Sequence, residues 1–157
     1  MIKFQRSLLV LLLVGSSFLL GGFSCRPKPK SDLPVLALKL GGQEVWVEVA
    51  NKEATRSSGL MFRQAMDWNN GMLFVFADSQ TRAFWMKNTL IPLSIAFLDE
   101  KGTILNIAEM QPQNEESIWS NGPARFAIEM NGGWYSKEGV KPGDVVEGVL
   151  DAPKAVE

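Results

Sequence analysis

The chain has 157 residues, of which 46% are hydrophobic and 21% are charged, and this composition indicates a globular protein with one domain. It contains no histidine and one cysteine, so serine–histidine triads, cysteine–histidine pairs and the usual zinc sites are excluded. Its 16 basic and 17 acidic residues form no basic patch, and we therefore expect no nucleic-acid partner.

The first 24 residues are predicted to be a signal peptide. Lys3 and Arg6 precede the 13-residue apolar run Leu8–Leu20, which is too short to span a bilayer and has the length of a secretory signal. Small residues follow and end at Cys25. The sequence therefore predicts that the folded part of the protein works outside the cytoplasm.

Cys25 is a candidate lipidation site, because the residues before it resemble the signal of bacterial lipoproteins. Residues 22 and 23 depart from the usual pattern, whereas Ser24 fits it. The alternative is cleavage near Ser24 by the ordinary signal peptidase, which would leave one free thiol. Lipidation predicts attachment to a membrane, in the periplasm or at the cell surface, through Cys25 and a flexible proline-rich tether that ends at residue 32.

A single domain is predicted over residues 33–157, and it begins with a hairpin. Residues 34–40 and 43–49 alternate between apolar and polar side chains. Gly41 and Gly42 join these two segments and form a typical two-residue hairpin turn.

The rest of the domain is predicted to be mainly β. Asn51 can cap a helix over residues 51–66, although Ser57, Ser58 and Gly59 weaken it. Further strands are expected at residues 71–76, 82–86, 93–99, 103–111, 124–130 and 144–150, with a helical turn or loop at 132–139. About eight short strands and one or two short helices predict an antiparallel β-sandwich or barrel-like fold.

Four segments resemble the domain of unknown function 192 family, also called uncharacterised protein family 0127. They are "RSSGLMFR" at 56–63, "GMLFVF" at 71–76, "FWMKNTLIPLSIAFLD" at 84–99 and "GVKPGDVV" at 139–146. The resemblance covers nearly all of residues 33–150 and implies a mainly β, sandwich-like fold with a helix, in a secreted or membrane-attached protein. It implies no activity. Ser94 stands where relatives usually carry aspartate. If that carboxylate serves a metal or a proton transfer in the relatives, this protein has lost it.

Charged residues that interrupt apolar runs are the strongest candidates for a site. Lys87 and Asn88 interrupt one apolar segment, and Glu129 interrupts another, so Lys87 or an arginine is a natural counter-charge for Glu129. On a strand, Trp85 and Lys87 point to the same face, and the lysine stem can lie along the indole ring.

Two arginines complete this set of candidates. Arg56 and Arg63 are seven residues apart, so they share a face if the predicted helix continues between them. One interpretation of the set is a purely structural ion pair between Glu129 and Lys87 or an arginine. In this interpretation Asn88 stabilises the bend at residues 90–92. The other is a pocket for an anionic or polyhydroxylated ligand, in which arginine and lysine bind charge and Trp85 stacks.

We expect a noncatalytic binding or envelope-interaction domain that needs no cofactor; its oligomeric state is left open. A cell-envelope hydrolase or lyase is the first alternative, and it predicts a cleft with a carboxylate of raised pKa. Pairs such as Glu44 with Glu48, or Asp99 with Glu100, are more simply an exposed strand face and a turn. The second alternative is copper(I) binding by thioethers, for which the candidates are Met61, Met66, Met72 and Met86.

Overall fold

A computed structural model describes residues 32–156, so the predicted signal peptide, Cys25 and the tether up to residue 31 lie outside the described residues. Within them, the elements follow in this order: β1 (Val35–Leu40), β2 (Gln43–Ala50), α1 (Glu53–Ser58), β3 (Asn70–Gln80), β4 (Ala83–Phe84), β5 (Leu93–Leu98), β6 (Ile104–Met110), β7 (Ile118–Trp119), β8 (Ala124–Asn131), α2 (Trp134–Glu138) and the 3-10 helix η1 (Val149–Asp151). In this part of the chain, no helix has the length and apolar character needed to cross a bilayer.

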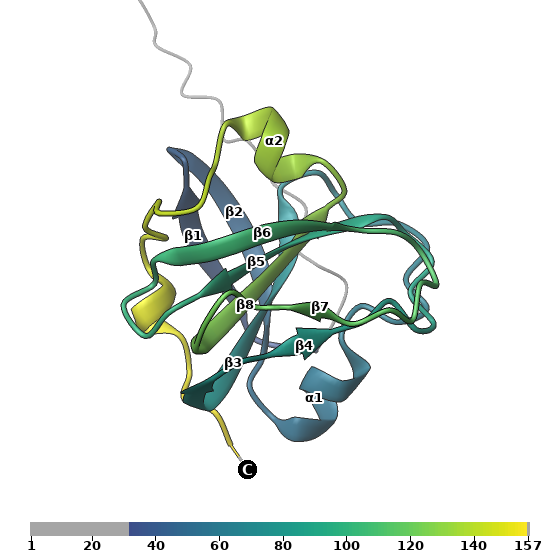
Figure 1. Ribbon diagram of the computed structural model, residues 1–157, viewed down its shortest axis with the longest axis horizontal. Helices are drawn as coiled ribbons and strands as arrows, with labels where there is room; N and C mark the ends of the chain where they lie inside the picture. The colour runs from purple at the N-terminus through teal and green to yellow at the C-terminus, as the bar shows by residue number, and fades with distance from the viewer. Residues whose placement is uncertain (1–31, 157) are drawn as a thin grey trace, which may run out of the picture.

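Six of the strands form one sheet in the order β1-β2-β3-β8-β5-β6, and β4 pairs with β7 in a separate two-stranded ribbon (Figure 1). All neighbouring strands are antiparallel except β2 and β3, which are parallel. A parallel pair needs a crossover between its strands. The chain supplies one here, because residues 51–69 run from the end of β2 back to the start of β3 and include α1.

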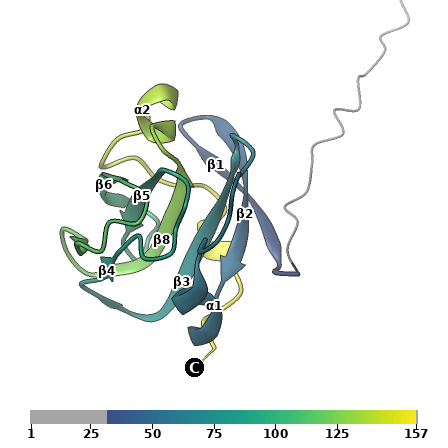
Figure 2. The ribbon, with the colours of Figure 1, turned by 90° about the vertical axis from the view of Figure 1, so that its right-hand side faces the viewer.

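Apolar side chains cover both faces of the bent sheet, which is seen from the side in Figure 2. Strand alternation assigns the faces: Val45, Val47 and Val49 of β2 join the cluster that contains Trp134 and Tyr135 at α2. The opposite cluster lies on the side of α1 and the β4–β7 ribbon, and it includes Leu60, Phe74 and Phe97. The strands β8 and β5 are buried on both faces because each face is covered.

The helix predicted over residues 51–66 is much shorter in the structure. It ends at Ser58, because Gly59 adopts φ +48°, a conformation that glycine tolerates and that stops the helix. A Cβ atom at Gly59 would also lie 3.5 Å from the ring of Phe74. The expectation that Arg56 and Arg63 share a helical face is therefore wrong.

The last predicted strand, residues 144–150, is also different. Glu147 and Lys39 of β1 exchange two backbone hydrogen bonds of 3.1 Å, and Val145 forms an isolated bridge to Thr103 just before β6. The segment thus touches both edges of the sheet but builds a regular ladder with neither, and η1 follows it. The predicted mainly β class with two short α-helices is confirmed, and the sheet is not closed into a barrel.

Candidate functional site

A pocket of about 300 Å³ lies beside α1 on the face of the sheet that carries the β4–β7 ribbon. One wall is α1 with the turn that follows it, and the other is β4 with the residues that follow it. The lining residues are Glu53, residues 56–61, Phe74 and Phe76 of β3, residues 83–85, Thr89, and Glu129 of β8. Three of the predicted site residues line this pocket: Arg56, Trp85 and Glu129. The other three do not belong to the pocket lining, and they are Arg63, Lys87 and Asn88.

Glu129 occupies the interior of the site. It stands in register with Met72 of β3 on one side and Ile95 of β5 on the other, and both neighbours belong to the apolar cluster of this face. Only 4% of the residue is exposed. Because Glu129 lines the pocket, its carboxyl group is the polar group that the sheet presents there.

Within residues 32–156, the Glu129 carboxyl group has neither an ion pair nor a side-chain hydrogen bond. Burial alone raises the pKa of Glu129 from its ordinary value of 4.5 to about 8. In the same part of the chain, every fully enclosed side-chain oxygen or nitrogen has a hydrogen-bond partner. The Glu129 oxygens have none among these residues, so they are not fully enclosed and remain accessible from the pocket. At neutral pH, Glu129 is therefore mostly protonated, and the ion pair that the sequence predicted for it is not formed.

Glu48 is a second buried carboxylate, and unlike Glu129 it is paired with a cation of the protein. It lies in the same cross-sheet row as Glu129, because Met72 is the register partner of both residues. The Arg63 guanidinium group donates two hydrogen bonds of 2.5 Å to the two oxygens of Glu48, whose side chain is 1% exposed. The expectation of an exposed Glu44–Glu48 face is wrong for Glu48, and Arg63 is a structural partner of that carboxylate.

Arg56 connects α1 to the sheet. Its Nη1 atom donates hydrogen bonds to the backbone oxygens of Asn51, at 2.9 Å, and Val75, at 3.2 Å. Its guanidinium carbon also lies 5.7 Å from the centre of the Phe76 ring. These contacts hold the wall of the pocket in place, since α1 itself has no buried residue.

Trp85 and Lys87 lie at the surface rather than in a buried strand. The exposed fraction of Trp85 is 49%, and the residue lines the pocket. The Lys87 Nζ atom is 5.3 Å from the centre of that ring, so the predicted contact of the lysine with the indole is confirmed. The strand predicted here is limited to β4, and Lys87 is solvent-exposed.

Asn88 acts through its backbone. It adopts φ +56°, a left-handed conformation that asparagine tolerates better than most residues, and its carbonyl oxygen accepts a hydrogen bond of 2.8 Å from the Phe62 amide. The contact joins the segment after β4 to the segment after α1. Asn88 therefore connects the two walls of the pocket at the level of the main chain.

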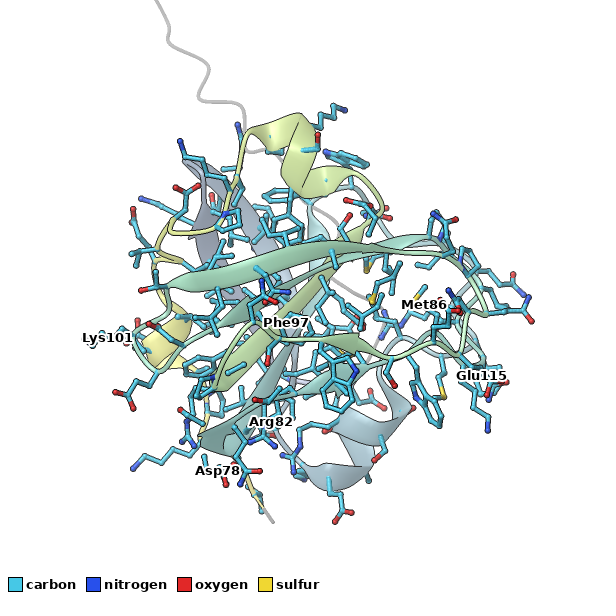
Figure 3. The ribbon with its side chains drawn as sticks, in the orientation of Figure 1. Asp78, Arg82, Met86, Phe97, Lys101 and Glu115 are labelled. Atoms are coloured by element: carbon cyan, nitrogen blue, oxygen red, sulfur yellow. The ribbon has the colours of Figure 1, made fainter. Side chains whose placement is uncertain are left out.

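The aromatic walls were not among the predicted site residues. Phe84 of β4 packs edge-to-face against Phe74 with ring centres 4.9 Å apart, and against Phe97 at 5.6 Å. Figure 3 labels Phe97 in the interior and shows Asp78 and Arg82 close together at the end of β3. Arg82 covers the Phe76 ring at 4.1 Å and bonds to Asp78. Apolar runs predict burial but not which rings face a cavity, so no sequence signal separates these residues from ordinary core.

Ser94 replaces the aspartate expected from the family resemblance, yet a carboxylate still lies beside it. The Ser94 hydroxyl donates a 2.7 Å hydrogen bond to Glu109, which comes from the neighbouring strand β6. The Gly133 amide, just before α2, donates to Ser94 Oγ at 2.8 Å and to Glu109 at 2.9 Å. Together the two side chains accept hydrogen bonds from the amide of Gly133, the N-cap residue of α2, and we assign them a structural role.

Two of the methionines considered for copper(I), Met72 and Met86, are each 1% exposed within the apolar cluster on the pocket side. Met66 packs against the same cluster, and Met61 lines the pocket. In residues 32–156, no group of three or more cysteine, aspartate and glutamate residues is arranged to hold a metal ion. Copper(I) binding by thioethers stays a prediction.

Two of the solved structures that resemble this one come from bacteria. A protein of Sinorhizobium meliloti 1021, described as a candidate transcription regulator, is 34% identical, with a TM-score of 0.73 over 78% of this chain and 99% of that chain. A protein of unknown function from Novosphingobium aromaticivorans DSM 12444 is 33% identical, with a TM-score of 0.70 over 76% and 89% of the two chains. No curated protein matches the chain.

The sequence pattern of DUF192, whose members are described as Uncharacterized ACR, matches residues 36–148. This range contains every residue that lines the pocket. Because the match extends over most of the chain, and because the Sinorhizobium relative is covered almost completely at 34% identity, the chain belongs to the DUF192 family.

Proposed function

We propose that this protein is a noncatalytic binding domain that holds a small organic ligand in the pocket beside α1. The observation that carries the proposal is Glu129, a buried carboxyl group without a counter-charge inside a pocket. Such a group destabilises the fold, whereas an apolar residue of similar size would fit the surrounding cluster. A protein keeps a costly polar group of this kind where the group serves binding or chemistry.

The surroundings of Glu129 suit a binding site. Ligand pockets combine mostly apolar walls with a few polar groups that fix orientation. Here Phe74, Phe84 and Trp85 provide aromatic surface, and Glu129 provides one polar group in the interior. The volume of about 300 Å³ falls at the lower end of the range for small-molecule sites.

A screen of a fragment library by ligand-observed NMR tests this proposal. Ser57 lines the pocket and is exposed, so Ser57→Trp places a large ring where a fragment would sit. Ser136 of α2 is also exposed but lies at the other end of the molecule, which makes Ser136→Trp a matched control (Figure 1). We expect fragments that bind the unmodified protein and Ser136→Trp but not Ser57→Trp. A screen in which Ser57→Trp loses no fragment contradicts the proposal.

We further propose that the domain is held at the outer side of a membrane by a lipid on Cys25. The support is the charged, apolar and small-residue order of the first 25 residues and the fact that Cys25 is the only cysteine. The full chain, produced in bacteria with radiolabelled palmitate, should take up label, and Cys25→Ser should not. Equal labelling of both proteins, or of neither, contradicts lipidation at this cysteine.

A cell-envelope hydrolase or lyase is the second candidate, because it predicted a cleft with a carboxylate of raised pKa and Glu129 has this property. An acid that stays protonated at neutral pH is suited to donate a proton to a leaving group. Glu53 lines the same pocket and is exposed, so it is a candidate for the second carboxyl group. Release of reducing ends from purified peptidoglycan, lost in Glu129→Gln, would favour this candidate over simple binding.

The description of the Sinorhizobium relative as a candidate transcription regulator adds no function here. A regulator that contacts DNA needs an excess of basic surface, and this chain has 16 basic residues against 17 acidic ones.

A further inference from the structure

Building on the binding function proposed above, we propose that the ligand is a small organic cation, with an ammonium or amidinium group that pairs with Glu129 and an apolar body that packs against Phe74, Phe84 and Trp85.

Among the described residues, no cation is paired with the Glu129 carboxyl group. Glu48 lies two strands away in the same row of the sheet, and the guanidinium group of Arg63 balances its charge through two hydrogen bonds. Glu129 has no such partner among the described residues, and Arg56 on the pocket wall directs Nη1 to two backbone oxygens instead. A ligand cation can supply the missing counter-charge in a site that is shielded from solvent.

Aromatic rings are the surface that the pocket offers, and ring faces attract cations. The protein's own cations already use rings at this site. The Lys87 Nζ atom lies 5.3 Å from the Trp85 ring, and the guanidinium carbon of Arg82 lies 4.1 Å from the Phe76 ring. The rings of Phe74 and Phe84, which pack edge-to-face in the pocket wall, remain to hold the apolar body of the ligand.

An anionic ligand fits the same site less well. It would meet the carboxyl groups of Glu129 and Glu53, both of which line the pocket. Two of the three basic residues first considered for an anion are absent from the lining, because Arg63 is held by Glu48 and Lys87 lies outside at Trp85. Only Arg56 remains, and its guanidinium group also holds α1 to the sheet.

Binding of a cation must be coupled to loss of a proton. The pKa of about 8 keeps Glu129 protonated at pH 7, so pairing with a cation requires that its proton passes to the solvent. The other titratable or charged groups around it are Glu53 and Arg56 of the pocket wall, the Glu48–Arg63 pair, and Tyr135, whose own pKa is raised mainly by burial and then by Glu129. Because the pKa of Tyr135 is raised well above its ordinary value, Tyr135 stays neutral in this range, and Glu129 is the group that releases the proton.

Three molecules of nearly the same shape test the charge preference by isothermal titration calorimetry of the full chain: benzamidinium, benzamide and benzoate. We expect benzamidinium to bind at least about tenfold more tightly than the other two at pH 8. Titrations at pH 7 in buffers of different ionisation enthalpy should show close to one proton released per benzamidinium bound. The number should fall well below one at pH 9, because Glu129 is then largely ionised before binding.

Variants locate the effect at Glu129. Glu129→Gln should lose the charge preference and the proton release together. Glu100→Gln, in the exposed β5–β6 turn next to Lys101 and far from α1 and β4 in Figure 3, should keep both. Equal or tighter binding of benzamide, benzoate or a methyl glucoside overturns the cation assignment but leaves the binding function standing. If none of the probes binds, the cation assignment also fails, while the fragment screen with Ser57→Trp decides the binding function independently.

Discussion

Removing the titratable group at Glu129 should change how the stability of the domain depends on pH. In the folded state the pKa of Glu129 is about 8 because of burial, whereas the ordinary value of 4.5 applies to the unfolded chain. Between these values the folded state binds more protons than the unfolded state, so the stabilising contribution is complete below pH 4.5 and is lost as the pH rises to about 8.

The size of the effect follows from the difference between the two pKa values. At about 1.4 kcal/mol per pH unit, the free energy of unfolding falls by about 5 kcal/mol in total, of which about 4 kcal/mol is lost between pH 5 and pH 8.5. Glu129→Gln has no proton to lose in this range. Its free energy of unfolding should therefore be similar to that of the unmodified protein at pH 5 and clearly higher at pH 8.5.

Urea denaturation followed by tryptophan fluorescence at several pH values from 5 to 8.5 measures this difference. The control is Glu100→Gln, whose exposed carboxyl group lies in a turn and should give a curve parallel to that of the unmodified protein. A parallel loss of stability in the unmodified protein and Glu129→Gln would contradict a folded-state pKa of about 8 for Glu129. That result would mean that Glu129 titrates as an ordinary carboxylate and is not an unpaired buried acid.

Three other substitutions test the packing around the site, each by its urea midpoint. Arg63→Met removes the guanidinium group that balances the buried Glu48 carboxylate, and it should cost about 3–5 kcal/mol. Glu48→Met in the same chain should restore most of this loss, and a double variant as unstable as the single one would contradict this pairing. Lys87→Met should change the free energy of unfolding by less than about 0.5 kcal/mol because the lysine is exposed. A loss of several kcal/mol would instead support the ion pair between Lys87 and Glu129 that the sequence suggested. Gly71→Ala should cost about 1–3 kcal/mol, since its Cβ would lie 2.4 Å from the backbone oxygen of Glu129, and an unchanged midpoint would show that β3 and β8 can separate there.

Strand alternation and turn residues were enough to predict the class of fold. The valines of β2 point to one face as expected, and Gly41 with Gly42 forms the first hairpin turn, with φ values of +56° and +81°. Local patterns failed where long-range packing decides the outcome. The helix after Asn51 stops at Ser58, and the segment 144–150 bridges two sheet edges instead of forming a strand.

Local sequence therefore determined the mainly β class, the first hairpin and the position of Glu129 as a charged residue inside an apolar run. Only the tertiary structure decided which charges meet. The parallel pairing of β2 with β3 places Glu48 and Glu129 in one row, and the chain after α1 brings Arg63 to Glu48. Lys87, which the sequence suggested as a partner for Glu129, lies at the surface instead. The physical reason is that strand register and the crossover connection decide which charged side chains, far apart in the chain, lie next to each other. Register and crossover depend in turn on how the whole sheet buries its apolar side chains.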